Sequence, residues 1–125
     1  MEVAIVLAYV AAALVALWGI AHAIPTRQVI AGFEPIEPDN RLVLIQEWLA
    51  EAVTMWGIAA IVVAATLAGS GTSVAVWVYR AAAGLLCALA MLTALTGART
   101  SVIWFKICPV LLATSAALLV VASLA

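Results

Sequence analysis

Four apolar stretches, each long enough to cross a lipid bilayer, constrain this chain more than any other feature of its sequence. A helix needs roughly 20 residues to cross a hydrocarbon core about 30 Å thick. The stretches run over residues 3–24, 42–68, 74–95 and 102–124. Because backbone polar groups in lipid must be satisfied within the protein, and because these runs are rich in alanine, we expect helices and not barrel strands.

The composition agrees with a membrane protein. Of the 125 residues, 69% are hydrophobic and 9% are charged, whereas a soluble domain has about 45–50% apolar and about 25% charged residues. The formal net charge is -1 and no basic patch is present, so we expect the lipid bilayer as a partner and no nucleic acid. Little sequence is left for a soluble domain. We therefore expect a single transmembrane domain over residues 1–125, with its longest loop at residues 25–41.

Strips of small residues at spacings of three and four recur in three of the apolar stretches. They are Ala8, Ala12, Ala16, Gly19 and Ala23 in the first, Ala81, Gly84 and Ala88 in the third, and Ala113, Ala116 and Ala117 in the fourth. Small side chains let helix backbones approach closely where lipid provides no hydrophobic drive for association. Together with the short loops, these strips predict an all-α polytopic membrane protein, an antiparallel four-helix bundle.

The distribution of Lys and Arg predicts an orientation. Four of the five basic residues fall at the face that carries the long loop, and these are Arg27, Arg41, Arg99 and Lys106. The terminal face has only Arg80. Since basic residues favour cytoplasmic loops, we expect an integral membrane protein with loop 25–41 in the cytoplasm and both termini outside.

Two glutamates, Glu47 and Glu51, lie inside the second apolar stretch. A charged side chain at the centre of a membrane helix costs at least about 2.5–3.5 kcal/mol, and such residues usually face the bundle interior and serve a function. Their i, i+4 spacing places both on one helix face. Apolar surroundings and a neighbouring acid would be expected to keep one carboxyl neutral and the other ionised, so that one could donate a proton while the other accepts one. We therefore expect both to be catalytic, with Glu51 the deeper acid.

Other polar residues fall where they can reach this pair. His22 and Lys106 lie roughly one turn from the long-loop face at a rise of about 1.5 Å per residue, and Arg80 enters from the opposite face with a long side chain. We expect His22 to be the third catalytic residue, because imidazole exchanges protons near neutral pH. Lys106 and Arg80 are expected in substrate binding, where they would stabilise an anion or hold Glu51 ionised.

Four more residues of the second stretch are candidates for substrate binding. Asn40 and Thr54 extend the polar stripe that contains the glutamates. Trp48 and Trp56 are expected to line an apolar pocket, in which ring faces can stabilise a developing positive charge.

A purely structural interpretation of the same residues stays open. Glu47 can be solvated near the surface, and ion pairs Glu51–Arg80 or Glu47–Lys106 would simply join helices. His22 sits in the last turn of the first helix, where its cation would favour the helix dipole. Lys106 and Arg80 can extend along the helix toward the membrane surface.

The two cysteines and the single histidine give no metal pattern. Cys87 and Cys108 lack CxxC spacing and are better interpreted as small apolar side chains than as a redox pair. No HExxH motif is present, and one histidine argues against bis-His haem and against most zinc sites built from protein ligands. We expect no metal and no cofactor.

Several short motifs taken together resemble a known family. They are Ala21-His22-x-x-Pro25-Thr26, Asp39-Asn40-Arg41, Glu47-Trp48-x-x-Glu51, Arg99-Thr100 and Lys106-x-Cys108-Pro109. In layout the chain is similar to small bacterial four-helix membrane proteins of the DoxX-like group. The resemblance implies a four-helix fold in a bacterial inner membrane, and an association with quinone-linked sulfur oxidation or redox complexes. The residues themselves indicate no quinone site.

Three functions remain as hypotheses. The first is an intramembrane enzyme that uses the paired carboxylates for acid–base chemistry, namely isomerisation, cyclisation or epoxide opening, on a lipophilic small molecule. The second is an accessory subunit of a membrane complex, which the small-residue strips fit equally well. The third is a small proton-coupled transporter, which would need at least a homo-oligomer. Small multidrug transporters carry their acid in the first helix, whereas residues 3–21 here contain no ionisable group except Tyr9.

Overall fold

The computed structural model describes all residues from Met1 to Ala125 and contains helices only. The elements in chain order are α1 (Glu2–Ala23), α2 (Thr26–Ala31), α3 (Pro38–Gly69), α4 (Ser73–Leu95), the 3-10 helix η1 (Gly97–Arg99) and α5 (Ile103–Ala122). Four of these segments are long and apolar enough to cross a membrane: α1, α3, α4 extended through η1, and α5. The expected all-α polytopic class is confirmed.

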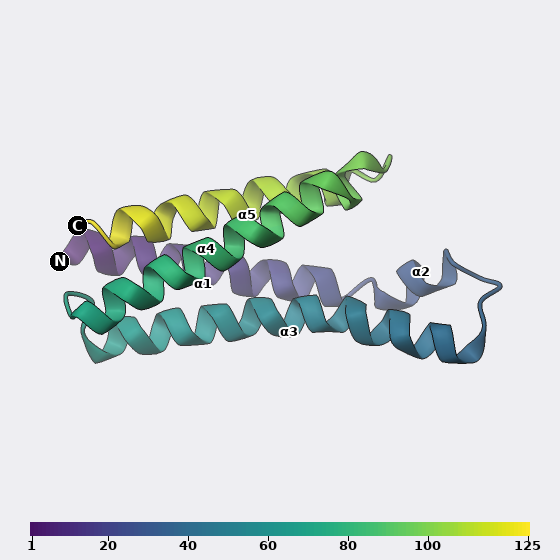
Figure 1. Ribbon diagram of the computed structural model, residues 1–125, viewed down its shortest axis with the longest axis horizontal. Coiled ribbons are helices and arrows are strands. Elements are labelled where there is room, and N and C mark those ends of the chain that lie inside the picture. Colours follow the sequence, from purple (N-terminus) through teal and green to yellow (C-terminus); the bar gives the residue numbers. More distant parts are fainter.

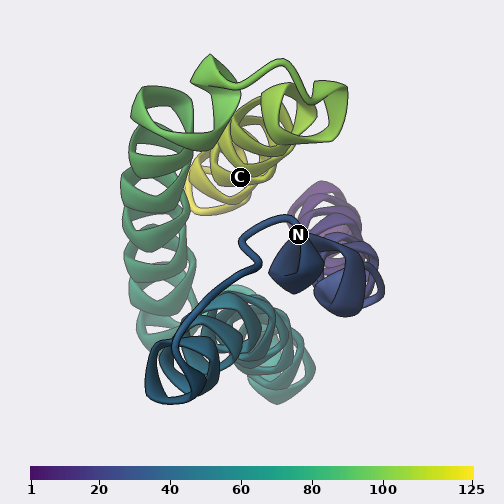
Figure 2. The ribbon, with the colours of Figure 1, turned by 90° about the vertical axis from the view of Figure 1, so that its right-hand side faces the viewer.

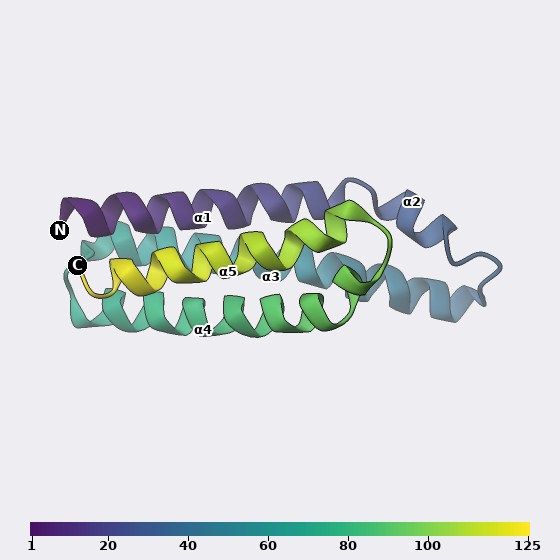
Figure 3. The ribbon, with the colours of Figure 1, turned by 90° about the horizontal axis from the view of Figure 1, so that it is seen from above.

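The four long helices form an elongated bundle. The chain passes along it four times, and both termini lie at one end, which we call the terminal end (Figures 1 and 3). The opposite end carries α2 and the connection through η1, and we call it the loop end (Figure 1). Viewed from the loop end, α1 neighbours α3 and α5, while α4 neighbours α5 and α3 (Figure 2).

The α3–α4 pair is the loosest of these four contacts. The two helices lie together at the terminal end, where the turn Ser70–Thr72 joins them, and α4 then diverges from α3 and approaches α5 at the loop end (Figures 1 and 2). The bundle therefore consists of two tight pairs, α1–α3 and α4–α5, which are splayed at the loop end.

Small residues allow the close approach of α1 to α3. Ala8 and Ala12 of the predicted strip are buried, and Gly19 is buried against Ala52 and Trp56. A Cβ atom added at Gly19 would lie 2.7 Å from Trp56 Nε1 and 3.3 Å from the Ala52 carbonyl oxygen. Because real Cβ atoms do not approach other atoms so closely, only glycine allows this helix spacing.

The predicted strip of small residues on α4, in contrast, does not pack against another helix. Its three small residues, Ala81, Gly84 and Ala88, are exposed, and a Cβ atom at Gly84 would meet nothing within 4 Å. The buried face of α4 is formed instead by a different row, namely Ala75, Tyr79, Ala82, Ala83, Leu86 and Ala90. Both rows have helical spacing, so the pattern of small residues alone could not indicate which row packs.

Helix α3 is longer than a single crossing requires. Its 32 residues correspond to about 48 Å at about 1.5 Å per residue, compared with a hydrocarbon core of about 30 Å. It begins at Pro38, four residues before the predicted start at Leu42, because proline is well suited to the first helical position. The extra turns protrude past α1 at the loop end, where the short helix α2 packs against them (Figure 3).

Candidate functional site

His22 and Glu51 meet where α1 ends against α3. His22 lies in the last turn of α1, and its Nε2 atom is 3.6 Å from Oε2 of Glu51. The His22 side chain is 8% exposed and that of Glu51 is 26% exposed. The structure thus brings together two of the three residues that the sequence suggested as catalytic.

Trp48 holds the imidazole of His22 in place. The two rings stack with their centroids 3.9 Å apart and their planes 17° from parallel. His22 Nε2 is 3.0 Å from the Trp48 carbonyl oxygen. Since a carbonyl oxygen can only accept a hydrogen bond, Nε2 must carry the proton, and the same N–H faces the Glu51 carboxylate. Trp48 therefore fixes both the orientation and the tautomer of His22.

One oxygen of Glu51 has no partner. Oε2 faces His22, but Oε1 is buried and has no hydrogen-bond partner in the protein. Buried polar atoms are rarely left unpaired, because losing hydration without a replacement bond costs about 1–3 kcal/mol. Oε1 can therefore accept a hydrogen bond from a bound molecule when the carboxyl group is ionised. When the carboxyl group is protonated, Oε1 can instead donate a hydrogen bond to such a molecule.

Helix α5 adds a third side to this region. The Trp18 indole donates a hydrogen bond to the Cys108 sulfur over 3.2 Å, and Phe105 meets Trp48 edge-on with ring centroids 6.0 Å apart. Cys108 is 5% exposed, in agreement with its interpretation as a buried side chain. We refer to Trp18, His22, Trp48, Glu51, Phe105 and Cys108 as the loop-end cluster. Its members come from α1, α3 and α5.

Trp18 and Phe105 fall in no motif of the sequence, and the motif Lys106-x-Cys108-Pro109 does not indicate that Cys108 meets Trp18. Their meeting depends on how α5 is placed beside α1, which no spacing within one helix encodes. The only available signal was the position of Trp18 and Cys108 near the same end of their respective apolar stretches.

Glu47 lies outside this cluster. Its side chain is exposed and its Oε1 accepts a hydrogen bond from Gln46 Nε2 over 3.2 Å. Because α1 ends at the level of Trp48, it does not extend over the turn of α3 that carries Glu47. The expected pairing of two buried carboxylates is therefore wrong, and Glu51 has an imidazole partner instead.

The two basic residues expected beside the glutamates lie elsewhere. Arg80 interacts with Ser123 and Trp77 near the terminal end, so the expectation that it reaches Glu51 is wrong. Lys106 is exposed and its Nζ donates to the Ala98 carbonyl oxygen over 3.0 Å. It thereby fastens the start of α5 to η1 and forms no ion pair with either glutamate.

The remaining candidates have local roles. Asn40 is exposed in the protruding first turn of α3, about three helical turns before Glu51. The Thr54 hydroxyl donates to the Ala50 carbonyl oxygen over 2.8 Å, within its own helix. Neither side chain forms a hydrogen bond with a member of the loop-end cluster.

Trp56 lines an apolar groove on the outer surface of the α1–α3 pair. Its indole donates to the Ala16 carbonyl oxygen over 3.3 Å. The groove has a volume of about 540 Å³ and only hydrophobic residues line it: Tyr9, Ala12, Ala13, Ala16, Trp56, Ala59, Ala60 and Val63. Trp48, the other tryptophan expected to line a pocket, does not border this groove.

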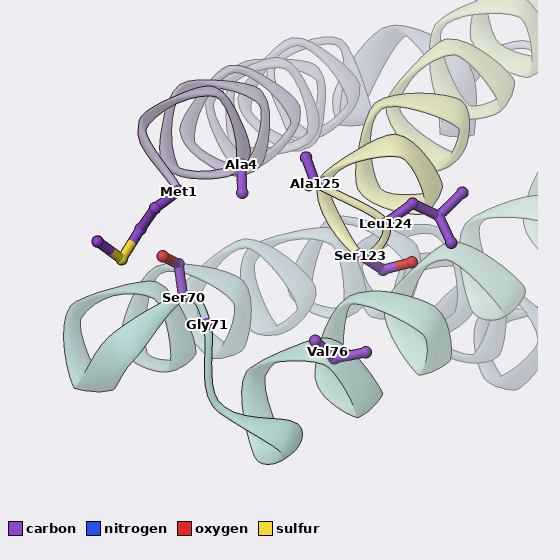
Figure 4. Close-up of a pocket in the computed structure, with 9 residues that line it drawn as sticks. Met1, Ala4, Ser70, Gly71, Val76, Ser123, Leu124 and Ala125 are labelled. Carbon is purple, nitrogen blue, oxygen red and sulfur yellow. The ribbon is translucent and has the colours of Figure 1, made fainter.

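A second cavity, of about 220 Å³, lies at the terminal end (Figure 4). The start of α1, the turn after α3, Val76 of α4 and the last residues of the chain form its walls, with Ser70 and Ser123 as its hydroxyl groups. Ser70, the C-cap of α3, follows Glu51 by 19 residues, which corresponds to about 28 Å at about 1.5 Å per residue, so the cavity lies far from Glu51. No three His, Cys, Asp or Glu side chains are grouped so that they could hold a metal ion.

Comparison of the chain with protein-family models, with curated proteins and with solved structures finds no match. Any functional inference therefore depends on the residues and geometry of the chain itself.

Proposed function

We propose that this protein is a small integral membrane enzyme that uses Glu51 and His22 for acid–base chemistry on a lipophilic small molecule. The observation that carries the proposal is the buried, unpartnered Oε1 of Glu51 beside an imidazole with a fixed tautomer. A purely structural ion pair would be expected to satisfy both carboxylate oxygens, since unpaired buried acceptors are unfavourable.

Glu51 is the residue that would touch the substrate. As a carboxylate it removes a proton from one atom of the bound molecule through Oε1, and as a carboxylic acid it returns that proton to a second atom of the same molecule. No atom is gained or lost, and no oxidant is required, so the reaction is an isomerisation or a cyclisation. Opening of an epoxide by a hydroxyl group of the same molecule also neither gains nor loses an atom, because the hydroxyl gives up one proton and the epoxide oxygen receives one. Such positioned proton transfer typically contributes about 10²–10⁴-fold to a rate.

His22 acts through Glu51. Its Nε2–H faces Oε2 and stabilises the ionised carboxylate before Glu51 takes up the proton and again after Glu51 has returned it. The His22 side chain is only 8% exposed and the Trp48 ring stacks on it, and electrostatic interactions are stronger in such apolar surroundings.

A lipophilic substrate fits the location of the cluster. Glu51 lies on α3, a helix long and apolar enough to cross a membrane, where a molecule dissolved in the bilayer would meet it without entering water. We further infer that the loop end faces the cytoplasm, because Arg27, Arg41, Arg99 and Lys106 lie there. The resemblance to DoxX-like proteins supports a bacterial inner membrane.

The test compares lipid extracts of cells that express the wild type or one of two variants. Glu51→Gln should abolish the formation of a product with the mass of its precursor but a different chromatographic retention. Glu47→Gln, one turn away on the same helix, should leave it unchanged because Glu47 is exposed and outside the cluster. Folding of each variant is checked by circular dichroism. Equal product formation by a folded Glu51→Gln variant would remove Glu51 from the mechanism.

The exposed small-residue row on α4 favours a second candidate function, that of an accessory subunit. Ala81, Gly84 and Ala88 are exposed, and such rows let another helix pack closely in a membrane. The partner would be another membrane subunit or a second copy of this chain. Purification in mild detergent should then yield a stoichiometric complex that Gly84→Leu disrupts. Repeated isolation of the monomer would count against this candidate.

A further inference from the structure

Arg80 is the only Lys or Arg side chain at the terminal end, and it has no acidic partner. Arg41 pairs with Glu34, and the His22 imidazole lies against Glu51, but Arg80 contacts no acidic side chain. It lies on α4, seven residues after the first residue of that helix, Ser73. An uncompensated guanidinium at this depth in a membrane helix is unfavourable unless it reaches the interface or a counter-charge.

Two contacts position the guanidinium group. Arg80 Nε donates to the hydroxyl oxygen of Ser123 over 3.4 Å, and the guanidinium carbon lies 5.4 Å from the ring centroid of Trp77. Ser123 is the C-cap residue of α5, so this bond directs the arginine toward the end of the bundle. The arginine is therefore held in one orientation instead of extending freely.

The terminal nitrogens of Arg80 remain available. Nε is the only atom of the guanidinium that forms a hydrogen bond within the protein, which leaves the N–H groups of both Nη atoms without an acceptor. Two parallel N–H groups from one guanidinium match two oxygens of a phosphate or carboxylate. The free edge of Arg80 is thus suited to a tetrahedral or planar anion.

The two helices that carry Arg80 and Ser123 expose apolar side chains near this end of the bundle. Trp77 is 67% exposed, and three further side chains near the end of α5 are also exposed: Val120, Val121 and Leu124. A small inorganic anion would gain no binding energy from such an apolar surface. An amphiphile fits both features, because its charged group would meet Arg80 while its hydrocarbon runs along α4 and α5 toward the middle of the bilayer.

We propose that Arg80, Trp77 and Ser123 form a binding site for the headgroup phosphate of an anionic phospholipid. The guanidinium binds the phosphate oxygens, Trp77 lies at the level of the headgroups as tryptophans commonly do, and Ser123 orients the arginine. A net anionic lipid is favoured over a zwitterionic one because the site presents a cation and no acidic side chain that would bind a headgroup amine.

The experiment measures binding of phosphatidylglycerol and phosphatidylcholine to the purified protein in detergent by native mass spectrometry. The wild type should retain phosphatidylglycerol in preference to phosphatidylcholine. Arg80→Gln should weaken phosphatidylglycerol binding by about fivefold, the effect of one basic residue near an anionic membrane surface. Arg99→Gln, which removes an exposed arginine at the other end, should leave it unchanged. Ser123→Ala should give a smaller loss.

A second variant and two competing anions separate a phospholipid site from a simple anion site. Arg80→Lys keeps the charge but not the two parallel N–H groups, so it should bind between the wild type and Arg80→Gln, and it serves if the glutamine variant fails to fold. Inorganic phosphate and glycerol phosphate, added at the same concentration, should not displace the lipid. Displacement by inorganic phosphate would show a simple anion site and overturn the lipid assignment. Unchanged lipid preference in folded Arg80→Gln and Arg80→Lys would overturn the proposal as a whole.

Discussion

Trp48 and His22 are joined by two reciprocal hydrogen bonds between α3 and α1. The Trp48 indole N–H donates to the His22 carbonyl oxygen over 3.0 Å, and His22 Nε2 donates to the Trp48 carbonyl oxygen, also over 3.0 Å. The rings stack between these two bonds. The His22 carbonyl is one of the last carbonyls of α1, which find no partner within their own helix. One tryptophan thereby completes the end of α1 and orients the residue beside Glu51.

Trp48→Phe tests this relationship. Phenylalanine keeps an aromatic ring for stacking on His22 but removes the indole N–H and leaves the His22 carbonyl oxygen without its donor. We expect a loss of stability of about 1 kcal/mol, the typical value for a hydrogen bond between membrane helices. Unfolding by SDS in mixed micelles, followed by circular dichroism, measures it.

The matched control is Trp104→Phe, because Trp104 is 64% exposed and forms no hydrogen bond within the protein. Its stability should equal that of the wild type. If both variants lost the same stability, the effect of Trp48 would be one of ring size and not of the reciprocal hydrogen bonds.

The helical spans could be predicted from the sequence because the signal is local. An uninterrupted apolar stretch determines a crossing by its own length, and α1, α4 and α5 begin and end within two residues of the predicted limits. The start of α3 was missed because its first turns lie beyond the bundle, where the apolar pattern ends and Pro38 begins the helix. Helix α2 was missed because Thr26–Ala31 is only six residues long.

The site could be predicted only as far as depth along each helix determines it. Counting residues from the loop end puts His22 about one turn deep and Glu51 deeper, but near enough for the two side chains to converge, and the structure brings them together. Depth says nothing about which side of a helix is covered. Glu47 shares a helix face with Glu51, yet it lies past the end of α1, and Lys106 is drawn to the Ala98 carbonyl instead.

Gly19→Ala should separate α1 from α3. The added methyl group would lie 2.7 Å from Trp56 Nε1 and 3.3 Å from the Ala52 carbonyl oxygen. The indole can rotate, but it would lose its hydrogen bond to the Ala16 carbonyl, and the backbone oxygen cannot yield without moving α3. We expect a loss of stability of about 1–3 kcal/mol, as for other overpacked sites, in the same SDS titration.

Gly84→Ala is the control for this substitution. The two glycines lie in long apolar helices, but a Cβ atom at Gly84 meets no atom within 4 Å. Alanine there should leave the stability unchanged or raise it, because glycine is the poorer helix former. A loss at Gly84 as large as that at Gly19 would show that the substitution acts on the helices themselves and not on the α1–α3 contact.

The proposed orientation of the bundle in the membrane predicts which end of the protein is accessible from outside the cell. Gln28 is exposed in α2 at the loop end, and Gly71 is exposed in the turn between α3 and α4 at the terminal end. If the loop end faces the cytoplasm, a membrane-impermeant maleimide should label Gly71→Cys in intact cells and Gln28→Cys only after permeabilisation. Cys87, which is exposed, is replaced by serine in both variants, whereas Cys108 is buried. The reverse pattern would invert the orientation, and labelling of both cysteines from one side would contradict a membrane crossing by α3.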